Sequence, residues 1–202
     1  TRYYSAAVRI SPQAAHLWDE WAEVYLSTGQ FDKALERLEI ARRLDEQFPL
    51  TYLYLGDTYI GMRRPNEALD AHAQVLKLNP GMLSDQRLEH RINFYLEWQL
   101  ADRLVPLYSA AAETFPQSAP VRSAFGYLLS KLGRIEEGAR EFEARVRITP
   151  EDWIARRNLA LSYEALGKVE SAIREAEESR NLAPADQKEA LGQWIAQLKL
   201  EK

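Results

Sequence analysis

The sequence predicts an all-α protein made of antiparallel helix pairs that pack against one another. Two helical patterns fill residues 49–80, where Tyr52, Gly56 and Tyr59 recur at three- and four-residue spacing and so share one helix face. One pair of short helices buries too little surface to fold alone. The same pattern returns at intervals of 34 residues. Together these observations indicate a helical repeat, in which each pair supplies a packing surface for the next.

Five registers of this length cover most of the chain, with Leu83 and Ser84 as a small insertion. They are residues 15–48, 49–82, 85–118, 119–152 and 153–186. A small residue recurs in the first helix (Ala22, Gly56, Gly126 and Ala160) and another in the second (Ala34, Ala68, Gly138 and Ala172). Proline cannot continue a helix, and it closes four registers, at Pro80, Pro116, Pro150 and Pro184. We expect Gly56 and Ala68 to face each other where their helices approach.

The turns inside the registers carry their own signals. Gly29 can take the left-handed conformation that ends a helix, and Asp32 follows it where an N-cap is expected. The third register departs most, because Arg91 replaces an apolar residue and Gln99 replaces the turn glycine. Pro106 falls inside its second helix and should bend it. This is either a local kink in a drifted repeat or a change of curvature that reshapes a binding surface.

The two ends have different expected roles. Residues 1–14 match the second helix of a preceding repeat, and the chain begins with threonine rather than methionine, which suggests a piece of a longer protein. A helix without its partner would leave Tyr3, Tyr4 and Val8 uncovered, so we expect weak self-association. Residues 187–202 are amphipathic and predict a C-terminal capping helix that covers the last repeat.

These registers resemble the tetratricopeptide repeat family over residues 15–186. The resemblance implies a right-handed α-solenoid whose first helices line a concave groove that binds a protein or peptide. Carried over by position, the peptide-binding groove comprises Asp19, Glu23, Leu26, Leu50, Leu53, Asp57, Ile60, Glu89, Asn93, Leu96, Tyr127 and Arg157. In the last two registers, the full set of groove positions is Pro120, Ser123, Tyr127, Ser130, Lys131, Ile154, Arg157, Leu161, Glu164 and Ala165.

The predicted groove is acidic in its first three repeats and has an apolar seam. The carboxylates are Asp19, Glu23, Asp57, Glu89 and Glu97. Such a surface favours a partner with basic residues beside apolar anchors. Asp19 and Glu23 occupy positions that bind a C-terminal carboxylate in chaperone adaptors of the family, and they would repel one here. The alternative function is an architectural or assembly segment of a larger, membrane-anchored bacterial protein.

No residue pattern predicts catalysis or a cofactor. The histidines, His16, His72 and His90, lie in three different registers and lack the spacing of a helical metal site. His72 occupies a helix-packing position. The sequence contains no glycine-rich phosphate loop and no pairing of a nucleophile with a base that it could justify. We therefore expect a binding protein that is not an enzyme and that has no metal site.

Composition limits the partners further. The formal net charge of −4 argues against a nucleic-acid partner, because such proteins usually carry a basic surface. No apolar run reaches the roughly 18 residues needed to cross a bilayer, so we expect no direct membrane insertion. The chain has no cysteine, which is compatible with reducing and oxidising compartments alike. A cytoplasmic location is the default, and an extracytoplasmic part of a membrane protein is the alternative.

Overall fold

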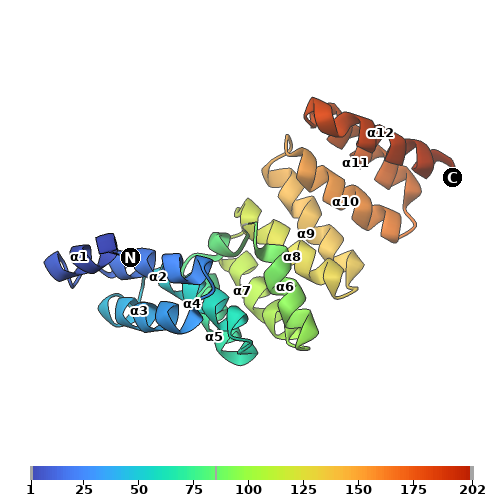
Figure 1. Cartoon of the computed structure of the whole chain (residues 1–202). Coiled ribbons are helices and arrows are strands. Elements are labelled where there is room, and N and C mark those ends of the chain that lie inside the picture. Colours follow the sequence, from blue (N-terminus) through green and yellow to red (C-terminus); the bar gives the residue numbers. More distant parts are fainter. Residues whose placement is uncertain (1, 85, 201–202) are drawn as a thin grey trace. The chain divides into compact units, whose positions relative to one another are not determined.

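The computed structural model describes residues 2–84 and 86–200 (Figure 1). Thr1, Asp85, Glu201 and Lys202 lie outside the described residues, although the predicted segments 1–14, 85–118 and 187–202 include them. The chain divides into two compact units, residues 1–107 and 108–202, and each is described by itself. The described residues form only helices, which confirms the predicted all-α class of a helical-repeat solenoid.

The first unit is built from consecutive helices joined by short turns. Its elements are α1 (Arg2–Ile10), α2 (Ala15–Ser27), α3 (Phe31–Leu44), α4 (Pro49–Gly61), α5 (Pro65–Leu78), the 3-10 helix η1 (Pro80–Ser84), α6 (Leu88–Glu97) and the 3-10 helix η2 (Ala101–Leu104). The main packed pairs are α2 with α3 and α4 with α5. Ala22, Ala34 and Leu38 are completely buried in the first of these pairs, so the small residues do mark its close approach.

The second unit repeats this organisation. It contains α8 (Ala119–Lys131), α9 (Ile135–Ile148), α10 (Trp153–Ala165), α11 (Val169–Leu182) and α12 (Ala185–Leu200), while α7 (Val105–Thr114) begins just before its boundary. Helix α8 pairs with α9, and α10 pairs with α11. Helix α12 packs on α11, where Ile195 and Leu198 join the buried Ala172 and Ala176. It starts directly after Pro184, two residues before the predicted capping segment.

Among the described residues, five turn residues have positive φ and recur at almost constant spacing. They are Gly29, Arg63, Gln99, Gly133 and Gly167, which lie 34 residues apart except for 36 between Arg63 and Gln99. The longer interval matches the two-residue insertion seen in the sequence. Gly29 therefore has the predicted left-handed conformation, and Gln99 adopts it despite its side chain, with φ of 56°. The fold thus requires this backbone geometry even where the sequence does not provide glycine.

Replacing Gln99 by glycine should raise the free energy of unfolding by about 0.5–1 kcal/mol. A side chain in the left-handed region is strained, and glycine removes that strain. Glycine also has more freedom in the unfolded chain, which offsets part of this gain in stability. Gly133→Gln is the matched reverse change, because a Cβ atom there would meet nothing within 4 Å and only the backbone is affected. Urea unfolding should show opposite shifts for the two variants. Shifts of the same sign would contradict this account.

The structure corrects three local expectations. Pro106 does not bend a helix, because α7 begins at Val105 and proline is tolerated in a first helical turn. Asp32 is not the N-cap of α3, since Gln30 holds that position and makes no side-chain cap bond. Gly56 does not face Ala68 most closely; a Cβ atom at Gly56 would lie only 2.1 Å from Nε2 of His72.

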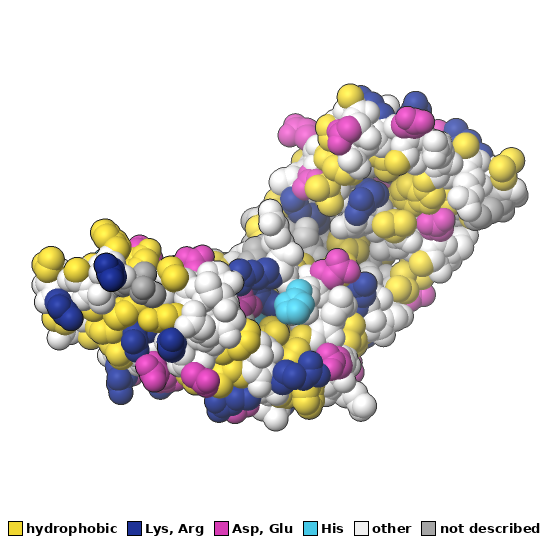
Figure 2. All heavy atoms as spheres, in the orientation of Figure 1, with side chains coloured by type: hydrophobic (Ala, Val, Ile, Leu, Met, Phe, Trp, Pro, Cys, Tyr) yellow, Lys and Arg dark blue, Asp and Glu magenta, His cyan; other side chains and the backbone are white. Residues whose placement is uncertain are grey.

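Helix α1 is less exposed than the sequence suggested. Val8 is buried against its neighbours, and Tyr4 is half-buried, because α1 packs on α2. Tyr3 and Ile10 remain largely exposed, at 74% and 83%. On the face shown in Figure 2, charged side chains of both signs lie interspersed, and apolar side chains gather over α1 and α2.

Candidate functional site

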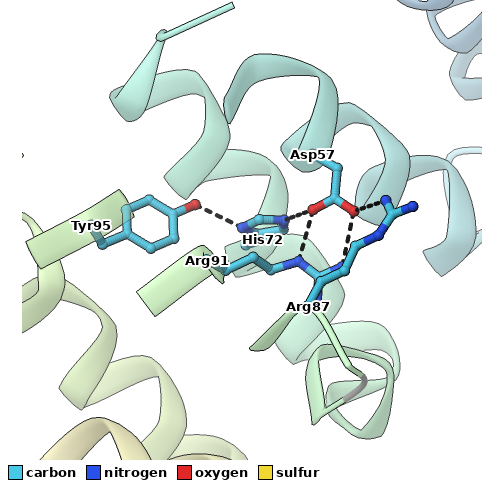
Figure 3. Close-up of polar contacts among 5 residues, drawn as sticks. All are labelled: Asp57, His72, Arg87, Arg91 and Tyr95. Atoms are coloured by element: carbon cyan, nitrogen blue, oxygen red, sulfur yellow. Dashed lines mark hydrogen bonds and ion pairs between the residues drawn. The ribbon is translucent and has the colours of Figure 1, made fainter. Parts of the chain in front are cut away.

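Asp57, on α4, is the centre of a buried polar network in the first unit (Figure 3). Both oxygens of its carboxylate accept hydrogen bonds from Arg91 on α6, from Nε at 2.7 Å and from Nη2 at 2.9 Å. Arg87 donates a further bond from Nη1 at 2.9 Å. His72, on α5, places Nε2 3.6 Å from Oδ1 of Asp57, and its Nδ1 shares a 2.7 Å hydrogen bond with the hydroxyl of Tyr95. Three helices of the unit therefore meet at one carboxylate.

The centre of the network is almost closed to solvent, whereas Arg87 at its edge is 52% exposed. The side chains of Asp57, His72 and Arg91 are 8%, 1% and 3% exposed. Burial by itself raises the pKa of Asp57, but the hydrogen bonds and positive charges of His72 and Arg91 outweigh it and hold that pKa well below its usual range. The carboxylate is thus ionised and fully engaged within the protein. The structure assigns it to helix packing and not to an open groove.

In the sequence, Arg91 stands out as a departure from the repeat, without an evident connection to Asp57. The two residues lie 34 positions apart, close to the 36 that separate equivalent positions of these two repeats. A second pair, Arg63 with Glu97, has the same separation and also forms an ion pair. The signal was therefore present, as opposite charges one period apart at positions that neighbouring repeats bring together.

Asp19, on α2, is also inaccessible to a ligand. Its side chain is completely buried, and Oδ2 accepts a 2.9 Å hydrogen bond from Thr51 on α4. Burial raises the pKa of Asp19 to about 7, which the bond from Thr51 partly opposes and the charge of Asp45 reinforces. The prediction that Asp19 contributes an open negative charge to a groove is therefore wrong, because α4 covers it.

The other predicted groove residues of the first unit have mixed surroundings. Leu53 and Ile60 are each 7% exposed and belong to the core, so they are not available as groove residues. The partly buried members are Leu26, Leu50 and Leu96, and the exposed members are Glu23, Glu89 and Asn93. Their exposure leaves these six as candidates for ligand contact.

The second unit contains a pocket between α8, α9 and α10 with a volume of about 240 Å³. Its lining is mainly apolar and comprises Tyr127, Ser130, Ile135, Phe142, Arg157, Asn158, Leu161, Ser162 and Ala165. Two residues named for the groove, Tyr127 and Arg157, lie here together. Ser130, Leu161 and Ala165 also occupy predicted groove positions, whereas Ile135, Phe142, Asn158 and Ser162 were not foreseen. The ring of Phe142 packs directly against Gly126, where a Cβ atom would lie only 2.9 Å from it.

The polar groups of this pocket differ in how they are engaged. Ser130 and Ser162 donate hydrogen bonds to carbonyl oxygens of their own helix, at 2.8 and 3.0 Å. The guanidinium of Arg157 lies 5.9 Å from the ring centre of Trp153 and makes no hydrogen bond or ion pair with any described residue. No carboxylate lines the pocket among the described residues. Its chemistry is an apolar recess with one positive charge.

A family model described as tetratricopeptide repeat matches residues 20–82 and 123–186. The chain belongs to the tetratricopeptide repeat family. Members of this family form protein interaction modules and are generally non-catalytic, and they bind protein or peptide partners. The human tetratricopeptide repeat protein 28 is 27% identical over 147 residues, which cover 72% of this chain. The chain spans only 6% of the length of that relative.

Solved structures share the fold at low sequence identity. PilF of Pseudomonas aeruginosa has a TM-score of 0.60 at 15% identity, with 93% of this chain and 85% of that chain covered. MamA of Desulfovibrio magneticus RS-1 has a TM-score of 0.57 at 19% identity, covering 83% and 94%. YrrB, described as a tetratricopeptide repeat protein with an unusual peptide-binding site, has 0.56 at 20% identity, covering 90% and 93%.

Two further findings concern membranes and metals. Among the residues described, no helix is both long and apolar enough to cross a membrane. Within residues 2–84 and 86–200, no group of three or more histidine or acidic side chains could hold a metal ion. The buried pair of His72 and Asp57 is instead engaged by arginine and tyrosine side chains.

Proposed function

We propose that this chain is a non-catalytic module that binds a segment of another protein at the groove positions of its first helices. In the second unit, the pocket between α8, α9 and α10 is the main anchoring point. The observation that carries this proposal is the coincidence of five predicted groove positions, Tyr127, Ser130, Arg157, Leu161 and Ala165, in one recess.

The size and lining of the pocket support a peptide side chain as its occupant. A volume of about 240 Å³ lies below the roughly 300–1,000 Å³ typical of small-molecule sites. Ile135, Phe142 and Leu161 provide apolar contact, and Leu161 is 44% exposed although it is a large apolar residue. Burying such a surface under an apolar anchor would supply much of the binding free energy.

In the first three repeats, fewer carboxylates are available to attract a basic partner than the sequence suggested. Asp19 is buried, Asp57 is engaged by two arginines, and Glu97 pairs with Arg63. Of the five carboxylates, Glu23, Glu89 and Glu97 are exposed. Attraction for lysine or arginine in the first unit is therefore proposed for these exposed carboxylates and not for Asp19 or Asp57, while the apolar anchors remain part of the proposal. Weak self-association through α1 also stays a prediction, with Tyr3 and Ile10 as its exposed residues.

Leu161→Gln should weaken binding of a selected peptide by at least about tenfold. The intact chain is used as bait for a library of displayed random peptides, and an enriched peptide is then measured by fluorescence anisotropy. The substitution removes apolar contact at the rim of the pocket without disturbing the core. Leu182→Gln is the matched control, because Leu182 is 40% exposed on α11 and lies outside the pocket.

Two results would count against the proposal. If both glutamine variants bind as the unmodified chain does, the peptide does not use this pocket. If the library yields no specific peptide with a correctly folded chain, the module does not bind short segments at all.

A further inference from the structure

Arg157 is unusual among the partly buried arginines of the second unit. Arg122 pairs with Glu141, Arg134 with Glu137, Arg145 with Asp152 and Arg156 with Glu175. Arg157, one position further along α10, has no carboxylate partner among the described residues, and its Nε atom is enclosed without an acceptor. A partly buried guanidinium without an acceptor is energetically unfavourable, so this position is poised to gain from an added anion.

The surroundings of Arg157 favour a negative group next to an apolar one. Leu161 follows it by four residues on the same helix and lies on the same wall of the pocket. The side-chain amide of Asn158 lines the recess and makes no hydrogen bond with a described residue. Lys131 places its Nζ 5.2 Å from the ring centre of Tyr127, which adds a second positive charge beside the pocket. Arg157 is the charged residue among the described residues that line the recess.

We infer that this pocket selects a peptide in which a large apolar side chain stands next to a carboxylate, with Arg157 as the specificity-determining residue. The apolar side chain fills the recess beside Phe142 and Leu161. The carboxylate accepts hydrogen bonds from the guanidinium, which can bind both of its oxygens at once. The carboxylate is either an acidic side chain or the C-terminal group of a chain. This inference rests on the proposed function and reverses the charge preference expected from the first three repeats.

The test uses the full chain and three synthetic peptides that differ only beside a leucine anchor, where they carry glutamate, glutamine or lysine. Each is prepared with an amidated C-terminus, and the glutamine peptide is also prepared with a free carboxylate. We expect the glutamate peptide to bind about tenfold to a hundredfold more tightly than the glutamine peptide. A gain for the glutamine peptide with a free carboxylate alone would assign the C-terminal group as the source.

The variants separate the charge from the packing. Arg157→Gln should remove the advantage of the carboxylate peptides and leave the affinity for the amidated glutamine peptide almost unchanged. Arg157→Lys should restore part of the advantage, and Arg157→Glu should transfer it to the lysine peptide. Arg147→Gln is the control, because Arg147 is an exposed arginine on α9 outside the pocket lining. Circular dichroism melting curves establish that each variant is folded.

The outcomes distinguish the inference from the function on which it rests. Equal binding of all three peptides by the unmodified chain, with loss on Leu161→Gln, would overturn the charge selectivity and leave the peptide-binding function standing. An unchanged advantage in Arg157→Gln would likewise overturn the role of Arg157. Failure of every peptide, including those from the random library, would reject the proposed function itself.

Discussion

Asp57→Asn is expected to lower the free energy of unfolding by about 3–5 kcal/mol, the usual effect of removing one partner of a buried ion pair. Arg91 would remain 3% exposed and would lose the carboxylate that accepts two of its N–H groups. Asparagine keeps the size of the side chain, so packing changes little. The decrease in the free energy of unfolding therefore measures the effect of removing the charge. Urea unfolding at neutral pH measures it.

The control for this prediction is an ion pair with the same sequence separation but an exposed location. Glu97→Gln breaks the pair with Arg63, whose two side chains are 55% and 63% exposed, and should cost at most about 1 kcal/mol. Adding Arg91→Met to Asp57→Asn should recover part of the lost stability, because the buried guanidinium is then removed together with its carboxylate. Similar small effects of Asp57→Asn and Glu97→Gln would show that the network does not stabilise the unit.

Asp19→Asn is expected to have the opposite effect, raising the free energy of unfolding at pH 8 by about 2–4 kcal/mol. Burial raises the pKa of Asp19 to about 7, so the folded state binds this proton more tightly than the unfolded state does. Its contribution is therefore fully present below about pH 4 and is lost as the pH rises through about 7. Asparagine does not titrate and can still accept the hydrogen bond from Thr51.

Unfolding measured at pH 5 and pH 8 tests this prediction. The unmodified chain should lose stability between these values, and Asp19→Asn should remove most of that loss. Asp70→Asn is the control, since Asp70 is exposed on α5 and its charge faces water. A pH dependence that persists in the Asp19 variant would mean that this carboxyl group does not cause it. Asp57 acts in the other direction, because its lowered pKa makes its contribution disappear as the pH falls below about 4.

The helices were predictable because small and apolar residues that recur with the helical period indicate the faces along which helices pack. The turn geometry was only partly predictable. A glycine at position 29 indicates a left-handed residue, whereas Gln99 adopts the same conformation without any sequence signal. Pro106 misled the sequence reasoning, because the register cannot show that the helix containing it begins one residue earlier.

The candidate site was harder to predict, because a position in a repeat fixes the direction of a side chain but not its neighbours. Tyr127 and Arg157 line one pocket, although they hold different positions, the ninth and the fifth, in adjacent repeats. Asp19 and Asp57 also hold a fifth and a ninth position in adjacent repeats, yet Thr51 and Arg91 come from other helices and enclose them. Whether an acidic side chain meets solvent or a partner is decided by residues about one repeat away.

The network around Asp57 also has a consequence for cooperativity. In a repeat protein, neighbouring units unfold together to the extent that their interface is favourable. Apolar interfaces between repeats, such as that of Phe142 with Leu159, depend little on protonation, whereas the contact of α4 with α6 includes an ionised carboxylate. The coupling between these two successive repeats is therefore set by acidity as well as by packing. Strong acid should weaken it first and turn one cooperative segment into two.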